Sequence, residues 1–267
     1  HTLPRTFYLS RHGQSEYNLL GKIGGDSGLS KNGEEYARRL GKFAKDVIGT
    51  KTITDDTGKE TKVPRPARLW TSTLRRTKET AKYIKHDAID VTWDNGDKNK
   101  WVQCRPNELR NLDELYAGNC DGMTYKEIET VYPDEFAARQ SDKLKYRYPR
   151  GESYMDVTLR LEPLAHRMES AQEPLLIIGH QGVLRILYAY FMGLSRADAP
   201  YMSIPLNHVI VLNPAAYGCT EDRICLMPKH EMVNDGQDEP ITSMPRNCPK
   251  EVHNYSKDDP IMNAPSC

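Results

Sequence analysis

Apolar residues recur at regular spacings in several separate stretches of this chain. Tyr36, Leu40, Phe43 and Val47 lie at positions i, i+4, i+7 and i+11. This spacing predicts one face of an amphipathic helix. Ser30 precedes that face and is a suitable N-cap, because its hydroxyl can accept a hydrogen bond from the first turn.

Two polar stretches interrupt this pattern. Residues 50–66 keep no apolar period and end in Pro64 and Pro66, and a second polar stretch runs from about residue 94 to about residue 110. A segment without a period offers no continuous apolar face to bury. We therefore expect both stretches to be solvated surface insertions.

Short apolar runs followed by helical patterns occur twice further along the chain. Residues 67–71 are typical of a buried strand, and residues 72–84 of the helix that follows it. Residues 175–178 form a continuous apolar run, typical of a strand covered on both faces, and residues 183–192 are typical of the next helix. Another helix, with Pro163 at a kink or in its first turn, is indicated by apolar residues at helical spacing: Val157, Leu161, Leu164 and Met168.

Strands that alternate with helices predict an α/β fold, in which a mainly parallel sheet lies between helices in three layers. Ligands of such sheets bind at the carboxyl ends of the strands. His12 follows the apolar run 7–9, and His180 follows the run 175–178, so both stand at strand ends. If the two strands are neighbours, we expect both histidines to share one pocket.

Length and charge narrow the classes of protein that this chain can belong to. Its 267 residues suit one α/β domain with insertions, and its 37 basic and 37 acidic residues balance. A broad surface for nucleic acid or anionic membrane is therefore not expected. The apolar runs fall far short of the ~20 residues that a membrane span needs. We expect neither nucleic acid nor a membrane as a partner.

The cysteines and the two ends of the chain bear on its location and boundaries. Six cysteines have neither the tight spacing of a disulfide scaffold nor a Cys-x-x-Cys metal motif, which predicts reduced thiols and a cytoplasmic protein. Residues 228–267 contain six prolines and little apolar period, which predicts an extended or disordered tail after a domain of residues 1–227. The chain begins at His1 rather than at a methionine, and this leaves open that it is a fragment of something longer.

The first candidate for chemistry is the triplet Arg11-His12-Gly13, directly after a strand. An imidazole attacks a phosphoryl group only if it is neutral, oriented and flanked by cations. Arg11 would supply the cation, and Gly13 would let the backbone approach an anion closely. The alternative is a strand-end histidine beside a surface arginine, and the triplet alone does not decide between the two.

Three further residues could complete such a site. Arg76 stands at a strand-to-helix junction, where backbone donors favour an anion, so it could clamp a phosphate. Glu114 is a candidate general acid, and His180 lies in the motif Gly179-His180-Gln181-Gly182. Taken singly, each has a plainer interpretation as a solvated arginine, a solvated carboxylate or a structural histidine.

The chain resembles the histidine phosphatase superfamily, which has a phosphoglycerate-mutase-like fold. The resemblance rests on the order of four features along the sequence: the triplet at residues 11–13, Arg76, Glu114 and His180. The likeness extends from about Pro4 to about Cys225, interrupted by the two insertions. More narrowly, four segments resemble the fructose-2,6-bisphosphatase domain of the bifunctional 6-phosphofructo-2-kinase/fructose-2,6-bisphosphatase enzymes: residues 11–18, 24–30, 146–154 and 215–219.

The resemblance implies hydrolysis of the 2-phosphate of fructose 2,6-bisphosphate through a phosphohistidine at His12. Arg11, Arg76 and His180 would hold the phosphoryl group, and Glu114 would protonate the leaving oxygen and then activate water. Asn18 would add a hydrogen bond. The resemblance also implies a set of residues that bind the sugar and its 6-phosphate: Tyr125, Arg139, Lys143, Tyr154, Gln181 and Arg185.

The proposed 6-phosphate site has some support from spacing. Arg139 and Lys143, at i and i+4, can present two cations on one helical face. The alternative for such a pair is an ordinary basic surface. No metal and no cofactor are expected, because arginines and histidines can neutralise a phosphoryl group.

Two positions depart from the family pattern, and other functions stay open. Gly179 stands where a cysteine is expected, and Tyr116 where an aspartate is expected, which puts the rate and its pH dependence in doubt. The alternatives are a phosphoglycerate mutase, a broad-specificity phosphatase of the same fold, or a catalytically silent sugar-phosphate-binding module. The chain contains no Gly-x-x-x-x-Gly-Lys-Ser/Thr loop, so a kinase domain, if present, would belong to a longer parent chain.

Overall fold

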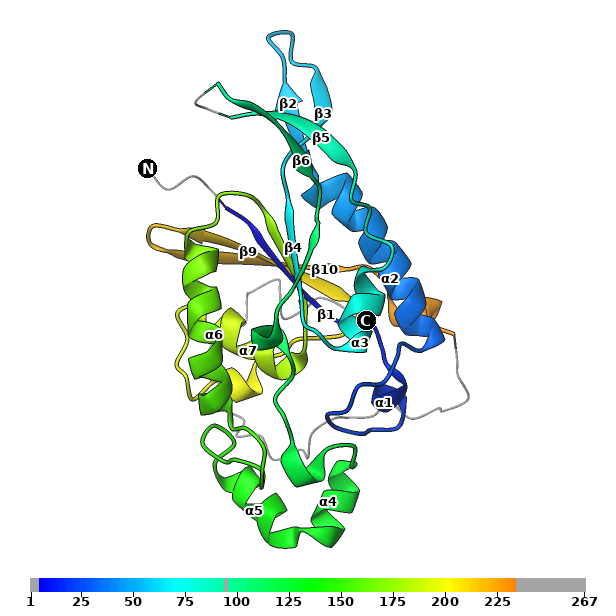
Figure 1. Ribbon diagram of the computed structural model, residues 1–267, viewed down its shortest axis with the longest axis vertical. Coiled ribbons are helices and arrows are strands. Elements are labelled where there is room, and N and C mark those ends of the chain that lie inside the picture. Colours follow the sequence, from blue (N-terminus) through cyan, green and yellow to red (C-terminus); the bar gives the residue numbers. More distant parts are fainter. Residues whose placement is uncertain (1–4, 94–95, 234–267) are drawn as a thin grey trace.

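A six-stranded mixed sheet forms the centre of the computed structural model, which describes residues 5–93 and 96–233 (Figure 1). The strand order is β10-β9-β1-β8-β4-β7, and the four strands from β1 to β7 in this order are parallel. The antiparallel strands β9 and β10 were not predicted from the sequence. The strands are β1 (Phe7–Arg11), β4 (Arg68–Thr71), β7 (Pro106–Glu108), β8 (Leu175–Gly179), β9 (His208–Ala215) and β10 (Gly218–Cys225).

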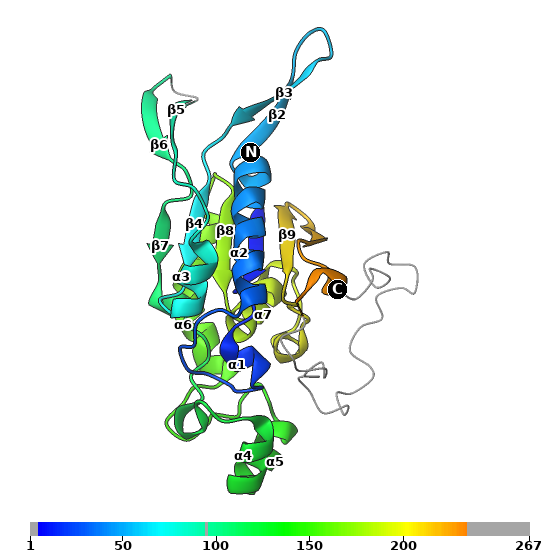
Figure 2. The ribbon, with the colours of Figure 1, turned by 90° about the vertical axis from the view of Figure 1, so that its right-hand side faces the viewer.

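Helices cover both faces of this sheet and one of its ends (Figure 2). The α2 and α3 helices lie on one face and α6 and α7 on the other, while α1, α4 and α5 gather beyond the carboxyl ends of the parallel strands. The expected α/β fold with helices on both sides of a sheet is therefore confirmed. The α-helices are α1 (Glu16–Leu19), α2 (Lys31–Phe43), α3 (Arg75–Ala81), α4 (Tyr125–Val131), α5 (Pro133–Ser141), α6 (Tyr154–Glu169) and α7 (Gln181–Phe191).

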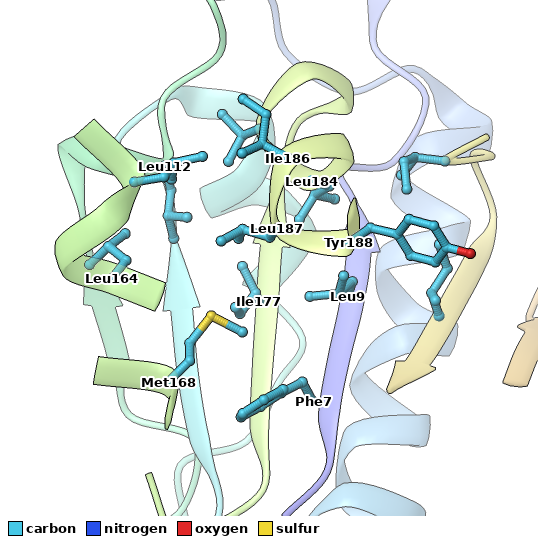
Figure 3. Packing of buried hydrophobic residues seen from close by; sticks show 14 of the residues in the cluster. Phe7, Leu9, Leu112, Leu164, Met168, Ile177, Leu184, Ile186, Leu187 and Tyr188 are labelled. Carbon is cyan, nitrogen blue, oxygen red and sulfur yellow. The ribbon is translucent and has the colours of Figure 1, made fainter. Parts of the chain in front are cut away.

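The hydrophobic core consists of two clusters, one on each face of the sheet. Successive side chains of a strand point to opposite faces, so Phe7 and Leu9 pack with α6 and α7, whereas Tyr8 packs with α2. Figure 3 shows the first cluster, where Ile177 and Met168 fill the space between strand and helix. All four apolar residues predicted for the α6 face are buried, and Pro163 lies inside this helix.

The predicted helix after Ser30 is present, with one error in its buried face. The Ser30 hydroxyl accepts a hydrogen bond from the Gly33 amide, as expected of an N-cap. Beyond Phe43 the chain continues as a π-helical turn, η1 (Ala44–Ile48). A π turn contains more residues than an α turn, so Ile48 faces the core, and Val47, expected on that face, is 39% exposed.

The two polar insertions form hairpins that project from the end of the molecule opposite α4 and α5 (Figures 1 and 2). The first is β2 (Thr50–Thr54) with β3 (Glu60–Pro64), and the second is β5 (Ala88–Thr92) with β6 (Lys98–Val102). Both faces of the β2–β3 hairpin are exposed at nearly every residue. Apolar and polar residues therefore do not alternate in this part of the sequence, and the two strands were not predicted.

The second polar stretch also contributes to the main sheet. It begins inside the second hairpin, continues through β6 and ends after β7, which pairs in parallel with β4 at the sheet edge. Residues 94 and 95 lie outside the described residues.

Most of the predicted tail, residues 228–267, lies outside the described residues, but its start packs on the body. A 3-10 turn, η5 (Lys229–Glu231), is followed by Val233, whose backbone forms two hydrogen bonds with the Asn32 side chain. Glu231 pairs with Arg39 at 2.6 Å.

Two expectations about partners and thiols can be compared with the structure. No helix in residues 5–93 or 96–233 is long and apolar enough to cross a membrane. Cys104, Cys120 and Cys219 are free thiols, but Cys225 is disulfide-bonded, which corrects the expectation that all cysteines are reduced.

Candidate active site

A pocket of about 1190 Å³ opens at the carboxyl ends of the parallel strands. Its lining includes residues from the end of β1, from α1, α2 and α3, from the helices α4 to α7 and from the segment 229–233. Of the twelve candidate residues, His180 is fully buried and lies beside His12, with ring centroids 5.2 Å apart and ring planes tilted by 54°. The other eleven line the pocket: Arg11, His12, Asn18, Arg76, Glu114, Tyr125, Arg139, Lys143, Tyr154, Gln181 and Arg185.

The pairing of β1 with β8 brings the two histidines together. Arg11 lies opposite Gly179 in the parallel register, so the next residue of each strand is a histidine. His12 Nδ1 lies 2.7 Å from the Gly13 carbonyl oxygen. A carbonyl can only accept a hydrogen bond, so Nδ1 carries the proton and Nε2 keeps its lone pair. Nε2 is thus the atom of this ring that can act as a nucleophile.

Burial and nearby cations keep the His12 imidazole neutral. Burial is the largest cause that lowers the pKa of His12 well below its ordinary 6.5, followed by the charges of Arg76 and Arg11. A charged imidazole is disfavoured in such surroundings. The ring is therefore uncharged near neutral pH.

His180 is held as the opposite tautomer. The Arg76 guanidinium donates from Nε to His180 Nδ1 at 3.1 Å, so Nε2 carries the proton and donates to Ser72 Oγ at 2.7 Å. Burial, and then Arg76 and His12, lower the pKa of His180 well below 6.5. Ser72, which the sequence analysis did not single out, thus fixes this ring.

Arg11 is a cation that lacks an anionic partner among the described residues. Its Nε is buried without a hydrogen-bond partner, and one terminal nitrogen lies 3.4 Å from the Ile204 carbonyl oxygen. Burial lowers the pKa of Arg11 to about 10, against the opposing charge of Glu114. An unpaired guanidinium at a pocket wall favours a bound anion.

Arg76 is also buried, at 4% exposed, and burial lowers its pKa. Besides His180, its guanidinium contacts the Gly25 carbonyl oxygen at 2.7 Å. Because Gly25 has a φ of 60°, glycine suits this turn. The turn thereby orients the arginine beside both histidines.

Glu114 is seated on the first turn of α7. The Gly182 amide donates to both carboxylate oxygens, at 3.1 and 3.2 Å, and the Leu115 amide donates to Oε1 at 2.9 Å. A Cβ atom at position 182 would lie 2.6 Å from Oε1, closer than real contacts allow. The Glu114 carboxylate can therefore occupy this position only if residue 182 is glycine.

The expectation that Arg139 and Lys143 share one helical face is wrong. The α5 helix ends at Ser141, because Asp142 adopts φ −146° and ψ 81°, so Lys143 lies beyond the helix. Both side chains nevertheless line the pocket. Arg139 donates to the Tyr125 hydroxyl at 3.0 Å, and the buried Lys143 donates to the Pro200 carbonyl oxygen at 2.9 Å.

The remaining candidates come from three helices. Arg185 donates to the Tyr154 hydroxyl at 3.1 Å and to the Met202 carbonyl oxygen at 2.7 Å. Asn18 Oδ1 accepts a hydrogen bond from the Ser15 amide in a capping box, so its amide nitrogen is the group that can donate to a ligand. Gln181 is the first residue of α7.

Tyr148 is a pocket residue that the sequence analysis missed. Its hydroxyl is buried without a hydrogen-bond partner, and the Arg139 guanidinium lies 5.8 Å from its ring centroid. Burial raises the pKa of Tyr148, so the hydroxyl stays a neutral donor. It lies in the segment 146–154 that carries part of the resemblance, but the sequence analysis gave it no role of its own.

The two residues that depart from the family pattern, Tyr116 and Gly179, lie in different surroundings. Tyr116 is 51% exposed and does not line the pocket. Gly179 ends β8, where an added Cβ atom would lie 3.2 Å from the Leu184 side chain. A larger residue there would require Leu184 to shift by a few tenths of an ångström.

Comparison with known proteins gives a consistent picture. The family model of the histidine phosphatase superfamily (branch 1) matches residues 7–226. A fructose-2,6-bisphosphatase from Saccharomyces cerevisiae is 45% identical over 83% of this chain and 42% of its own length. A 6-phosphofructo-2-kinase/fructose-2,6-bisphosphatase from Aquarana catesbeiana is 41% identical over 94% of this chain and 46% of its own length. The chain thus spans less than half the length of these relatives.

Solved structures with low sequence identity show the same fold. A putative alpha-ribazole-5'-P phosphatase from Escherichia coli superposes with a TM-score of 0.64 at 18% identity, over 82% of this chain and 94% of that one. An alpha-ribazole phosphatase from Shigella flexneri gives 0.63 at 19% identity, over 82% and 96%. The sheet and its flanking helices are therefore an arrangement that these proteins share.

Proposed function

Because this chain belongs to the histidine phosphatase superfamily, we propose that it hydrolyses the 2-phosphate of fructose 2,6-bisphosphate and releases fructose 6-phosphate and phosphate. The observation that carries this proposal is one pocket that joins a neutral imidazole with a free Nε2 lone pair to an arginine without an anionic partner. Relatives at 41–45% identity carry the bisphosphatase name, which supports this substrate.

In the first step, His12 Nε2 attacks the phosphorus atom of the 2-phosphate. A phosphorus–nitrogen bond forms, and the bond from phosphorus to the sugar O2 breaks. Glu114, in its protonated form, gives its proton to O2, so the sugar leaves as an alcohol rather than as an alkoxide. Arg11 and Arg76 stabilise the negative charge on the phosphoryl oxygens.

In the second step, water cleaves the phosphohistidine. Glu114, now a carboxylate, takes a proton from the attacking water, and the phosphorus–nitrogen bond breaks as His12 regains its lone pair. His180 donates no charge to the pocket, since it is neutral, but its fixed ring holds Arg76 in place. The cycle needs no cofactor and no metal, because arginines supply the positive charge.

The rest of the pocket would bind the sugar and its 6-phosphate. Arg139 and Lys143 offer two cations, and a second phosphate requires a second set of cations. Asn18 would contact the transferring phosphoryl group. The remaining donors would bind sugar hydroxyls and phosphate oxygens: Tyr125, Tyr154, Gln181 and Arg185.

Phosphate release from fructose 2,6-bisphosphate by the wild type and by His12→Asn tests this proposal. We expect the wild type to form fructose 6-phosphate and an acid-labile phosphoprotein, and the variant to form neither. Faster turnover of phosphoglycerates or of other monoesters would favour a mutase or a broad phosphatase. Tight binding of the sugar without phosphate release would favour a silent binding module.

The relatives' names also bear on the wider role. We propose that the activity serves regulation of glycolysis. We also propose that a kinase domain belongs to a longer parent chain, since relatives about twice as long as this chain are named for both activities. The full coding sequence decides the second point. A cytoplasmic location is part of the proposal; the free thiols of Cys104 and Cys120 support it, and the disulfide of Cys225 counts against it.

A further inference from the structure

The segment that carries Glu114 has little regular structure of its own. Only a single 3-10 turn, η2 (Arg110–Leu112), precedes it, and Asp113 is already extended. Glu114 contacts α7 only through its carboxylate, which accepts hydrogen bonds from the Gly182 amide. Contacts from elsewhere in the fold must therefore fix the backbone on which this carboxylate stands.

Thr73 binds the Asp113 carboxylate through its amide and its hydroxyl, and one arginine on a neighbouring helix binds the backbone of the segment. Arg160 of α6 donates to the carbonyl oxygen of Asn111, to that of Asp113 at 2.7 Å and to that of Glu114 at 3.3 Å. The Asn111 side chain returns a hydrogen bond to the Arg160 carbonyl oxygen at 2.6 Å. The planar guanidinium thus binds three carbonyls of one short segment, which a lysine ammonium cannot match in geometry.

Glu152 completes this arrangement from the other side. It accepts two hydrogen bonds from Arg160, at 2.8 and 3.1 Å, and one from the Tyr116 amide at 3.0 Å. The Glu152 amide donates to the Tyr116 carbonyl oxygen at 2.8 Å. The carboxylate therefore orients the guanidinium and also holds the chain just after Glu114.

We propose that Arg160 is a positioning residue for the general acid: it sets the place of Glu114 by binding the carbonyls of residues 111, 113 and 114. This proposal rests on the role proposed above for Glu114. Arg160 does not line the pocket, and its side chain is 21% exposed. Its effect on the reaction therefore passes through the segment and not through contact with substrate.

The dependence of rate on the leaving group tests this role. A sugar or glycerol oxygen needs a proton to leave, whereas p-nitrophenolate leaves without one. We expect Arg160→Gln and Arg160→Lys to lower kcat/KM on fructose 2,6-bisphosphate and on β-glycerophosphate about 10- to 100-fold more than on p-nitrophenyl phosphate. The ratio kcat/KM covers only the steps up to release of the alcohol, so the later attack of water, which Glu114 also assists, does not enter it. Glu114→Gln should show the same selectivity, and Arg160→Gln combined with Glu114→Gln should lose little more than Glu114→Gln alone.

A matched control exists on the same helix. Arg167 of α6 stacks on Trp70, 4.7 Å from its ring centroid, away from the Glu114 segment. Arg167→Gln should leave the ratio of rates on the two kinds of substrate unchanged. This ratio does not depend on the fraction of enzyme that is folded, so a loss of stability in an Arg160 variant does not obscure the result.

The outcomes separate the proposals. Equal losses of kcat/KM on both kinds of substrate would overturn the positioning role. It would also be overturned if Arg160→Lys kept the wild-type ratio of rates on the two kinds of substrate while Arg160→Gln changed it, because charge alone would then suffice. If the wild type hydrolyses β-glycerophosphate but not fructose 2,6-bisphosphate, the proposed substrate fails, and the ratio still tests Arg160. If the wild type hydrolyses no alkyl phosphate, the general acid and its positioning residue fail together.

Discussion

Replacement of Arg11 by methionine should stabilise the fold while it removes activity. The lowering of the Arg11 pKa from the ordinary value of arginine to about 10 corresponds to about 3 kcal/mol by which the fold disfavours the charged guanidinium, at about 1.4 kcal/mol for each pH unit. The side chain is partly open to the pocket, where water reduces this cost. We therefore expect Arg11→Met to raise the free energy of unfolding by about 1–2 kcal/mol at pH 7.

The sign of this effect follows from linkage. A cation whose pKa is lowered by folding destabilises the fold at every pH where it is charged in both states. For Arg11 this range lies below its folded pKa of about 10, and the cost disappears as the pH rises from there toward 12.5. Unfolding in urea at pH 7 therefore measures the full effect.

A gain of 1–2 kcal/mol should raise the melting temperature by about 2–8 °C in a chain of this size. Inorganic phosphate should stabilise the wild type, by about 2.7 kcal/mol at one hundred times its Kd, but stabilise Arg11→Met far less. Arg75→Met is the matched control, because Arg75 is 64% exposed and pairs with Glu79 on α3. We expect this control to change stability by less than about 0.5 kcal/mol.

The reasoning would be refuted if Arg11→Met were less stable than the wild type, or if phosphate stabilised both equally. The first result would mean that the guanidinium has an internal partner. The second would mean that Arg11 is not the anion contact of the pocket.

Three other predictions concern the same pocket. Gly182→Ala should lower kcat on a sugar phosphate about 100-fold, because the new methyl group displaces the Glu114 carboxylate. Circular dichroism and the melting temperature should show an intact fold, and an unchanged kcat would contradict the prediction. Tyr148→Phe should raise KM for the substrate about tenfold and leave stability unchanged, since its hydroxyl has no partner to lose; equal affinity measured by calorimetry would count against the contact. Nitrogen-15 NMR at pH 6 should show neutral His12 protonated on Nδ1 and neutral His180 protonated on Nε2. The free energy of unfolding should fall as the pH drops below 6.5, by up to about 1.4 kcal/mol per pH unit for each ring. Two charged rings at pH 6 would contradict the assignment.

The sequence predicted the convergence of the two histidines only on the condition that their strands are neighbours. His12 and His180 each follow an apolar run, and the structure meets the condition because β1 pairs with β8. The sequence also indicated Arg76 and Glu114 as candidates, but only the resemblance joined them to the histidines. Spacing along the chain carries no information on which loops meet above a sheet.

Other features were beyond reach because they depend on backbone geometry. The end of α5 before Lys143 is fixed by the conformation of Asp142, which the i, i+4 spacing does not reveal. Gly13 was expected to admit an anion, yet a Cβ atom there would lie 2.6 Å from the Gly33 carbonyl oxygen, so close packing of two backbones requires this glycine. Arg160 acts on carbonyl groups, which every residue has, and its sequence context therefore gives no hint of its contacts.

The position of β1 within the sheet has a consequence for synthesis of the protein. This strand, which is followed directly by His12, hydrogen-bonds on one side to β8 and on the other to β9. Both partners are made only after residue 174, so β1 must stay unpaired while most of the chain emerges from the ribosome. Contacts between such distant segments form slowly. A nascent chain that stops short of β8 therefore holds no active site, and chaperones that bind exposed apolar strands would have the segment at residues 7–9 as an early target.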